Sequence, residues 1–304
     1  MSIARPLSDA VADLVQSLPL RAAGFIVTLY GDAVVPRGGA VWIGTIIETC
    51  ATVGISETLV RTAVSRLVAS GQLEGWRRGK RSYYRLSDGA GTEFEAAGRL
   101  IYGPPEAWQW RFLHLPADTA EAEMARLERQ GYARLRPQLA VGPARGPVPK
   151  GLLAFDGDPH GALDLLPGFA ALGWDLAPHA QAYRDLIDRF SPLDGLVPDE
   201  TAAGDGAMAM AARLLLVHAW RGALLRDPRL PAAALPADWP GHAARALFHR
   251  LYAALSPAAD SHAGRSFEGA NGPLPAITPA IEARMAANKD KPDQGLRGTG
   301  LRTG

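Results

Sequence analysis

Positive charge is concentrated in one short stretch of a chain that is otherwise close to neutral. The 304 residues contain 32 Lys and Arg against 31 Asp and Glu, yet residues 61–85 contain seven basic side chains and a single acid, Glu74. A face that binds a polyanion needs such a concentration, because neutralising phosphates releases condensed counterions. The stretch favours a nucleic-acid partner, although a charged solubilising surface explains it as well on charge alone.

The apolar pattern around this charge predicts two helices joined by a tight turn. Apolar residues repeat at helical spacing over residues 43–51, and Gly54 then provides the left-handed residue that commonly ends a helix. Ser56 is a suitable N-cap for the next helix. Upstream, a helical pattern over residues 14–29 is interrupted at Pro19, and residues 32–39 have the composition of a turn. Two helices joined by a short turn indicate a helix-turn-helix.

The helix after Ser56 has an apolar face and a polar face. The apolar face would consist of Leu59 or Val60 with Ala63, Val64, Leu67 and Val68. Arginine and hydroxyl side chains near a helix N-terminus suit the major groove, where arginine binds guanine and hydroxyls reach bases or phosphates. The candidates on the polar face are Thr58, Arg61, Thr62, Ser65 and Arg66.

Two short strand patterns follow, over residues 73–76 and 82–86, and a Gly-containing turn rich in cations joins them. A hairpin in this position is the wing of a winged helix, and its cations would contact the phosphate backbone or the minor groove. An ordinary charged hairpin is the alternative. The wing candidates are Arg77, Arg78, Lys80 and Arg81.

Gly103, Pro104 and Pro105 suggest a hinge, after which the pattern changes to β-α-β-β-α-β. The expected strands are residues 108–115, 134–141, 151–155 and 174–176, and the expected helices are residues 119–130 and 160–172. The first strand contains no acid that could bind a catalytic metal, and Asp118 is the first acid after it. A turn explains Asp156 and Asp158 more simply than a metal site does.

The rest of the chain is predicted to be helical up to residue 256 and disordered after it. Helices are expected over residues 182–190, 208–225 and 243–255, and proline ends the second of them at Pro228. Residues 257–304 are rich in Gly and Pro and contain a single aromatic residue, Phe267. Such a segment buries too little apolar surface to offset the entropy of ordering it, so we expect it to be disordered.

Several functional classes are excluded or disfavoured. A single cysteine, Cys50, excludes a disulfide framework and a cysteine-based zinc site, and it fits a reducing cytoplasm. The most apolar segment is interrupted by Arg213, so no membrane span is expected. Asp9 and Asp13 lie where a signal peptide would be apolar. Neither a metal site nor a cofactor is expected, since the seven histidines lack zinc-binding spacing and no nucleotide-binding glycine motif occurs.

Four segments resemble a known family of bacterial regulators. FIVTLYGD (residues 25–32), VPRGG (35–39), LVRTAVSRLVASG (59–71) and GKRSYYRLSDGA (79–90) resemble the N-terminal domain of the PaaX family of repressors of phenylacetate catabolism. LLRDPRLPAAALPADWPG (224–241) is similar to the family's C-terminal signature, although its Ala-rich part matches loosely. The similarity extends over residues 18–255.

This resemblance implies an α+β multidomain fold and a regulatory function. The expected domains are a winged helix-turn-helix that binds DNA (residues 1–103), a ferredoxin-like, Cas2-like middle domain (104–178) and a helical C-terminal domain (179–256), followed by the tail (257–304). The family implies a homodimeric repressor that binds double-stranded operator DNA and is released by an aryl-CoA thioester such as phenylacetyl-CoA.

A CoA thioester requires cations for its phosphates and an apolar slot for its acyl group. The sequence offers such residues in the middle and C-terminal regions, although each aromatic among them is individually more typical of a core and each arginine of a surface. The candidates are Trp108, Trp110, Arg111, His218, Trp220, Arg221 and Arg226.

Three hypotheses about function remain open at this point. The first is a repressor that responds to a ligand. The second is a metal-dependent nuclease in which the Cas2-like middle domain cuts DNA that the winged helix selects. The third is a DNA-binding protein without a ligand, in which the C-terminal domain serves only for dimerisation.

Overall fold

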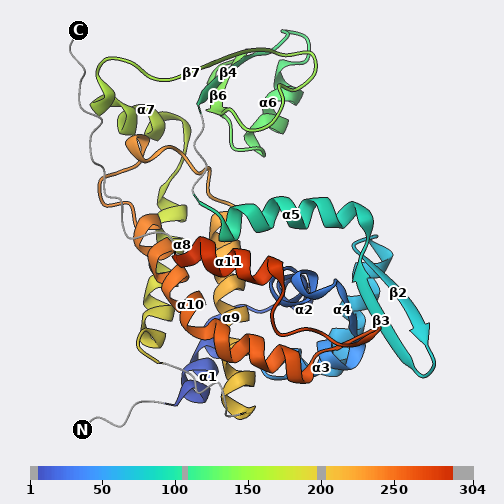
Figure 1. The fold of residues 1–304 in the computed structure, drawn as a ribbon. Helices are drawn as coiled ribbons and strands as arrows, with labels where there is room; N and C mark the ends of the chain where they lie inside the picture. Colours follow the sequence, from blue (N-terminus) through green and yellow to red (C-terminus); the bar gives the residue numbers. More distant parts are fainter. Residues whose placement is uncertain (1–5, 105–108, 197–202, 290–304) are drawn as a thin grey trace. The chain divides into compact units, whose positions relative to one another are not determined.

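The computed structural model describes residues 6–104, 109–196 and 203–289, and the chain divides into two compact units (Figure 1). Unit 1 contains residues 1–104, 189–219 and 246–304, and unit 2 contains residues 105–188 and 220–245. The fold is α+β, as expected, with helices and small antiparallel sheets in each unit. Among the described residues, no helix has the length and apolar character needed to cross a membrane.

The first part of unit 1 places a group of helices against a three-stranded sheet in the order β1-β3-β2. The helix predicted to break at Pro19 forms two helices, and Gly54, with φ of +77°, follows α3 as expected. The elements are α1 (Leu7–Ser17), α2 (Ala22–Leu29), β1 (Ala40–Trp42), α3 (Ile43–Ala51), α4 (Glu57–Ala69), β2 (Leu73–Arg78), β3 (Arg81–Leu86) and α5 (Asp88–Tyr102).

The segment between α2 and β1 is more than the turn that its composition predicted. A π-helical turn (Tyr30–Val34) and a 3-10 turn (Val35–Arg37) continue α2, and Gly38 and Gly39, both with positive φ, then redirect the chain into β1. Asp32 and Arg37 are 1% and 3% exposed. Charged side chains that are buried this deeply require hydrogen-bonding or ionic partners. The segment therefore connects to other parts of the fold and is not a simple surface turn.

The later part of unit 1 contains most of α9 (Ala203–Leu224) and of α10 (Gly241–Ser266), all of α11 (Pro279–Lys289), and a small hairpin of β8 (Glu268–Gly269) and β9 (Gly272–Pro273). The expected disorder after residue 256 does not hold for residues 257–289. Helix α10 continues through Pro257, and Ala259, Ala263 and Phe267 are buried. Contacts with the rest of unit 1 supply the burial that the segment's composition cannot supply alone.

Unit 2 is built on a four-stranded antiparallel sheet in the order β5-β6-β4-β7. Leu113, Met124 and Leu127 are among the residues packed between one face and α6, and Trp110, Val141 and Ala170 are among those between the other face and α7. The elements are β4 (Trp110–His114), α6 (Ala120–Glu128), β5 (Ala133–Arg136), β6 (Leu139–Pro143), β7 (Leu153–Gly157), α7 (Leu166–Gly173) and most of α8 (Ala177–Phe190).

Unit 2 differs from the predicted β-α-β-β-α-β order in two places. Residues 134–141 form two strands instead of one, because Arg136 pairs with Leu139 and leaves Pro137 and Gln138 as a two-residue turn, a position that suits the fixed φ of proline. Residues 174–176 form no strand. The fourth strand is β7, which follows β6 without an intervening helix. Residues 179–256, expected to form a separate domain, are shared between the two units.

Candidate nucleic-acid interface

Helix α4 is held by its apolar face and exposes its polar face. The Ser56 side chain caps it by accepting a hydrogen bond from the backbone N–H of Leu59 at 3.5 Å, as predicted. Val60, Ala63, Val64 and Leu67 are buried. Of the two residues predicted as alternatives, Val60 is the buried one and Leu59 is 56% exposed. Val68, which we expected on the buried face, is 38% exposed, because it lies at the margin of the apolar stripe.

All five residues predicted for the polar face of α4 are exposed: Thr58, Arg61, Thr62, Ser65 and Arg66. Thr58, Thr62 and Ser65 lie along one line of the helix because they are four and three positions apart. Thr62 Oγ1 donates to the carbonyl of Thr58 at 2.8 Å. The helix therefore presents a continuous strip of hydroxyl and guanidinium groups.

Arg61 is held by an ion pair within the helix. Its Nε and one terminal nitrogen donate to Glu57 Oε1 at 2.8 and 2.7 Å, and both side chains are more than half exposed. An exposed pair four residues apart is worth about 0.3–0.5 kcal/mol. A phosphate or a guanine can displace Glu57 at small cost, so the pair orients Arg61 without withholding it.

The β2–β3 hairpin ends in a two-residue turn. Arg78 pairs with Arg81, which leaves Gly79 and Lys80 at the tip, and Gly79 has φ of +62°. In one of the common two-residue hairpin turns only the first turn residue has positive φ, and Gly is required at that position, as found here. Below the tip, the rings of Trp76 and Tyr83 stack with centroids 6.1 Å apart, and Tyr83 is buried. The base of the hairpin is thus anchored while its tip is exposed (Figure 1).

The four wing candidates, Arg77, Arg78, Lys80 and Arg81, are all exposed, but two of them contact another hairpin of unit 1. Arg78 donates to the carbonyl of Ala270 and to the side chain of Asn271. A terminal nitrogen of Arg81 lies 3.4 Å from a carboxylate oxygen of Glu268, and the guanidinium carbon of Arg81 lies 4.6 Å from the centre of the Trp42 ring. The contacts with Glu268, Ala270 and Asn271 come from a segment expected to be disordered, so the sequence offered no signal for them.

The candidate ligand residues do not form one cluster. Trp108 lies outside the described residues. Trp110 and Trp220 are 4% and 1% exposed and belong to the interior of unit 2. Arg111, also in unit 2, binds Asp156 with two hydrogen bonds of 2.7 Å. His218 is in unit 1, where its Nδ1 lies 2.9 Å from Thr28 Oγ1.

Two cavities of unit 2 are lined by other members of this set. Arg226 is exposed and lines a cavity of about 570 Å³, which Arg129 and Arg145 also line. Trp110 lines a second cavity, of about 330 Å³, with Phe155 and Phe169. Arg221 lines neither cavity and is half-buried.

A buried charged cluster in unit 1 was missed by sequence reasoning. Arg213 donates to Asp32 at 3.0 Å and to Asp260 at 2.6 Å, and Arg37 also binds Asp260. The hydroxyl of Tyr102 donates to Asp32 at 2.9 Å. Burial raises the pKa of Asp32, but Arg213 and other cations outweigh burial and hold this pKa below its usual value. The one signal was Arg213, the cation within an apolar helix.

Comparisons with known proteins agree with the motifs. The family model described as "PaaX-like protein" matches residues 21–90, and the model described as "PaaX-like protein C-terminal domain" matches residues 174–265. The chain is 30% identical to the transcriptional repressor PaaX of Escherichia coli K12 over 289 residues, which cover 89% of this chain and 92% of that protein. This chain belongs to the PaaX family.

The part of the chain matched by the first PaaX model runs from α2 to the start of α5 and contains the whole candidate interface. The part matched by the second includes α8, α9 and most of α10. A solved structure, the uncharacterized protein Rv0674 from Mycobacterium tuberculosis, is 26% identical, with a TM-score of 0.45, and the similarity covers 72% of this chain and 90% of that one.

Proposed function

We propose that this member of the PaaX family is a transcriptional repressor whose unit 1 binds duplex DNA as a winged helix. Helices α3 and α4 form the helix-turn-helix, and β2 and β3 form the wing. The single observation that best supports this function is the exposed strip on α4 next to a hairpin with exposed cations at its tip. Membership of a family that includes a transcriptional repressor supports it independently.

The two parts of this surface make different contributions to binding. In α4, Arg61 and Arg66 reach guanine or phosphate, and the hydroxyls of Thr58, Thr62 and Ser65 contact base edges or phosphates in the major groove. The wing cations Arg77, Arg78, Lys80 and Arg81 bind the phosphate backbone, which adds affinity but no sequence preference. The α4 contacts thus choose the operator and the wing contacts hold the protein on DNA.

We propose that an effector releases the protein by changing the spacing of two such interfaces in a homodimer. A homodimer places two copies of α4 at half-sites about 34 Å apart, or at a multiple of this spacing. An aryl-CoA thioester that binds more tightly to a dimer with a different spacing lowers the affinity for DNA. The size of this effect is set by the ratio of the thioester's affinities for the two dimer arrangements. The family resemblance supports phenylacetyl-CoA as that effector and genes for the breakdown of aromatic acids as the target.

For unit 2 we propose a ferredoxin-like, Cas2-like sheet that lacks its second crossover helix. A nuclease in this unit receives no support. Strand β4 contains no acid, and Arg111 neutralises Asp156 through two hydrogen bonds. Asp158, the other acid of the predicted turn, accepts a hydrogen bond from Gln109 at 3.2 Å.

The experiment that tests this function measures binding of the full-length protein to the DNA upstream of its own gene and the adjacent genes. Fluorescence anisotropy with and without phenylacetyl-CoA should show tight binding that the thioester reverses, and a scrambled fragment of equal length is the control. Equal affinity for both fragments would refute sequence-specific repression. If no aryl-CoA thioester changes DNA binding and calorimetry detects no binding of these ligands, the remaining hypothesis is a DNA-binding protein that has no ligand.

A further inference from the structure

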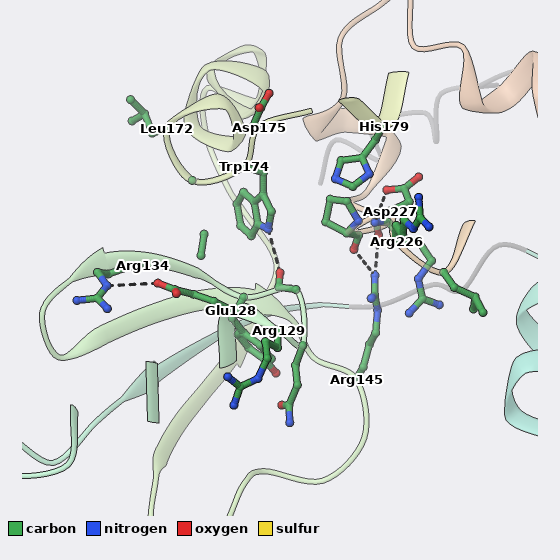
Figure 2. Close-up of a pocket in the computed structure, with 18 residues that line it drawn as sticks. Glu128, Arg129, Arg134, Arg145, Leu172, Trp174, Asp175, His179, Arg226 and Asp227 are labelled. Carbon is green, nitrogen blue, oxygen red and sulfur yellow. Dashed lines mark hydrogen bonds and ion pairs between the residues drawn. The ribbon is translucent and has the colours of Figure 1, made fainter. Parts of the chain in front are cut away.

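The larger cavity of unit 2 is lined by an excess of positive charge (Figure 2). Five arginines line the cavity, Arg129, Arg134, Arg145, Arg226 and Arg229, together with the acids Glu128, Asp175 and Asp227. Arg134 is already paired with Glu121 and Glu128, which leaves four arginines against two acids. A polar hollow of about 570 Å³ with this charge suits an anionic ligand of the phosphate type.

A rigid loop holds two of these arginines at the cavity. Asp227 is 8% exposed and accepts from the Tyr183 hydroxyl and from the backbone N–H of Arg229, both at 2.6 Å. Arg145 donates to the carbonyls of Pro228 and Arg229 at 2.6 and 3.0 Å. Arg229 has φ of +53°, a conformation that non-glycine residues rarely adopt and that often marks a functional site. The loop is therefore pre-organised.

The smaller cavity has the opposite chemistry. Four of its nine lining residues are aromatic, namely Trp110, Phe112, Phe155 and Phe169, and its volume is about 330 Å³. Two acids also line it, of which Asp156 is neutralised by Arg111 and Asp158 accepts a hydrogen bond from Gln109. Phe155 is 60% exposed, so an apolar ring at the cavity is accessible to a ligand. A hollow of this kind suits an aryl group.

The two cavities are neighbours along one helix. Leu166 and Phe169 of α7 line the aromatic cavity, whereas Leu172 and Gly173 of the same helix line the cationic one. The eight residues of α7 rise by about 10 Å. The rings of Trp110 and Trp174, one from each cavity, pack in the same core cluster with centroids 5.9 Å apart. The two cavities are therefore close enough for one ligand with a long flexible chain to reach both.

We infer that the two cavities are the two ends of one effector site, with the phosphate groups among the arginines and the aryl group among the aromatic rings. This inference rests on the proposed function, because a CoA thioester of an aromatic acid is the ligand that joins an aryl group to phosphates through a long flexible chain. Of the ligand candidates from the sequence, Arg226 then binds phosphate and Trp110 borders the aryl group.

The test is isothermal calorimetry of the full-length protein with free coenzyme A and with phenylacetyl-CoA. Arg226→Gln should weaken both ligands about tenfold or more, whereas Arg136→Gln, an exposed arginine of β5 that lines neither cavity, should weaken neither. Phe155→Ala should weaken phenylacetyl-CoA about tenfold and leave coenzyme A unchanged. The matched control is Leu153→Ala, which is also exposed on β7 but lies outside both cavities.

Wild-type affinity in Arg226→Gln, equal weakening of both ligands by Phe155→Ala, or no binding of either ligand to the wild type would overturn the inference. Failure of the repressor proposal gives a different result, because all the DNA contacts proposed above come from unit 1. Every variant should therefore retain the upstream DNA as the wild type does when no ligand is present. A protein that binds phenylacetyl-CoA at this site but binds no DNA would refute the repressor and leave the site standing.

Discussion

Replacing Arg213 with methionine should be among the most destabilising single substitutions in unit 1. The side chain is 1% exposed and supplies charge-assisted hydrogen bonds to Asp32 and Asp260. Each such bond is worth about 1.5–3 kcal/mol, and removing one partner of a buried ion pair costs about 3–5 kcal/mol. We therefore expect the free energy of unfolding to fall by about 4 kcal/mol, a large part of the 5–15 kcal/mol typical of a folded protein.

The loss should depend on pH in a defined direction. In the wild type the pKa of Asp32 is lowered, so the stability that its charge contributes is present above the unfolded pKa of about 3.9 and disappears as the pH falls through the folded value. Without Arg213, the largest of the charges that lower the pKa of Asp32 is lost, although Arg284 and Arg37 remain. This pKa is therefore higher in the variant than in the wild type, and acid relieves the variant by neutralising the carboxylate. The difference between the two proteins should be largest near neutral pH and should shrink toward pH 4.

Urea unfolding followed by circular dichroism measures this difference, and the chain offers a matched control. Arg250 forms an ion pair with Asp194 at 2.8 Å, and both side chains are about half exposed. Arg250→Met should cost no more than about 1 kcal/mol, because solvent screens exposed pairs. If Arg213→Met costs no more than Arg250→Met at neutral pH, the buried cluster does not stabilise unit 1 as argued.

Three further outcomes are expected. Lys80→Gln should reduce the slope of log affinity against log salt by about 0.9 for operator and scrambled DNA alike, since one phosphate contact is lost; an unchanged slope would remove the wing tip from the interface. Glu268→Gln should tighten DNA binding about two- to fivefold at low salt by releasing Arg81, and weaker binding would show instead that Glu268 positions the wing. Burial raises the pKa of the Cys50 thiol to about 12, so iodoacetamide at pH 8 should label it in urea but not in the native protein, as mass spectrometry can check.

The elements of the interface could be predicted because their signals are local. A helical repeat, the Ser56 cap and a Gly at the hairpin turn each act within a few residues, and the structure has α4, its cap and the hairpin where the pattern indicated. The margins of α4 were harder to assign. Leu59 and Val68 are apolar, yet periodicity alone does not show how wide a stripe the neighbouring helices cover.

The remaining differences arise from contacts between distant parts of the chain. Asp32 and Arg213 are 181 positions apart, and nothing local shows that one neutralises the other. The segment after Pro257 is poor in apolar residues but folds where the rest of unit 1 covers it. Likewise, an aromatic such as Trp110 looks the same in a sequence whether it fills a core or borders a cavity, and it does both here.

The most direct test of the central claim compares operator and scrambled DNA for two variants. In the α4 variant, Thr58, Arg61 and Ser65 become alanine, and in the wing variant Arg77 and Lys80 become glutamine. All five side chains are exposed, so both variants should fold as the wild type does. If α4 selects the sequence, its variant should bind operator DNA no better than scrambled DNA, whereas the wing variant should bind both more weakly and keep the ratio between them. An α4 variant that still prefers the operator as strongly as the wild type would contradict the assignment of sequence recognition to this helix.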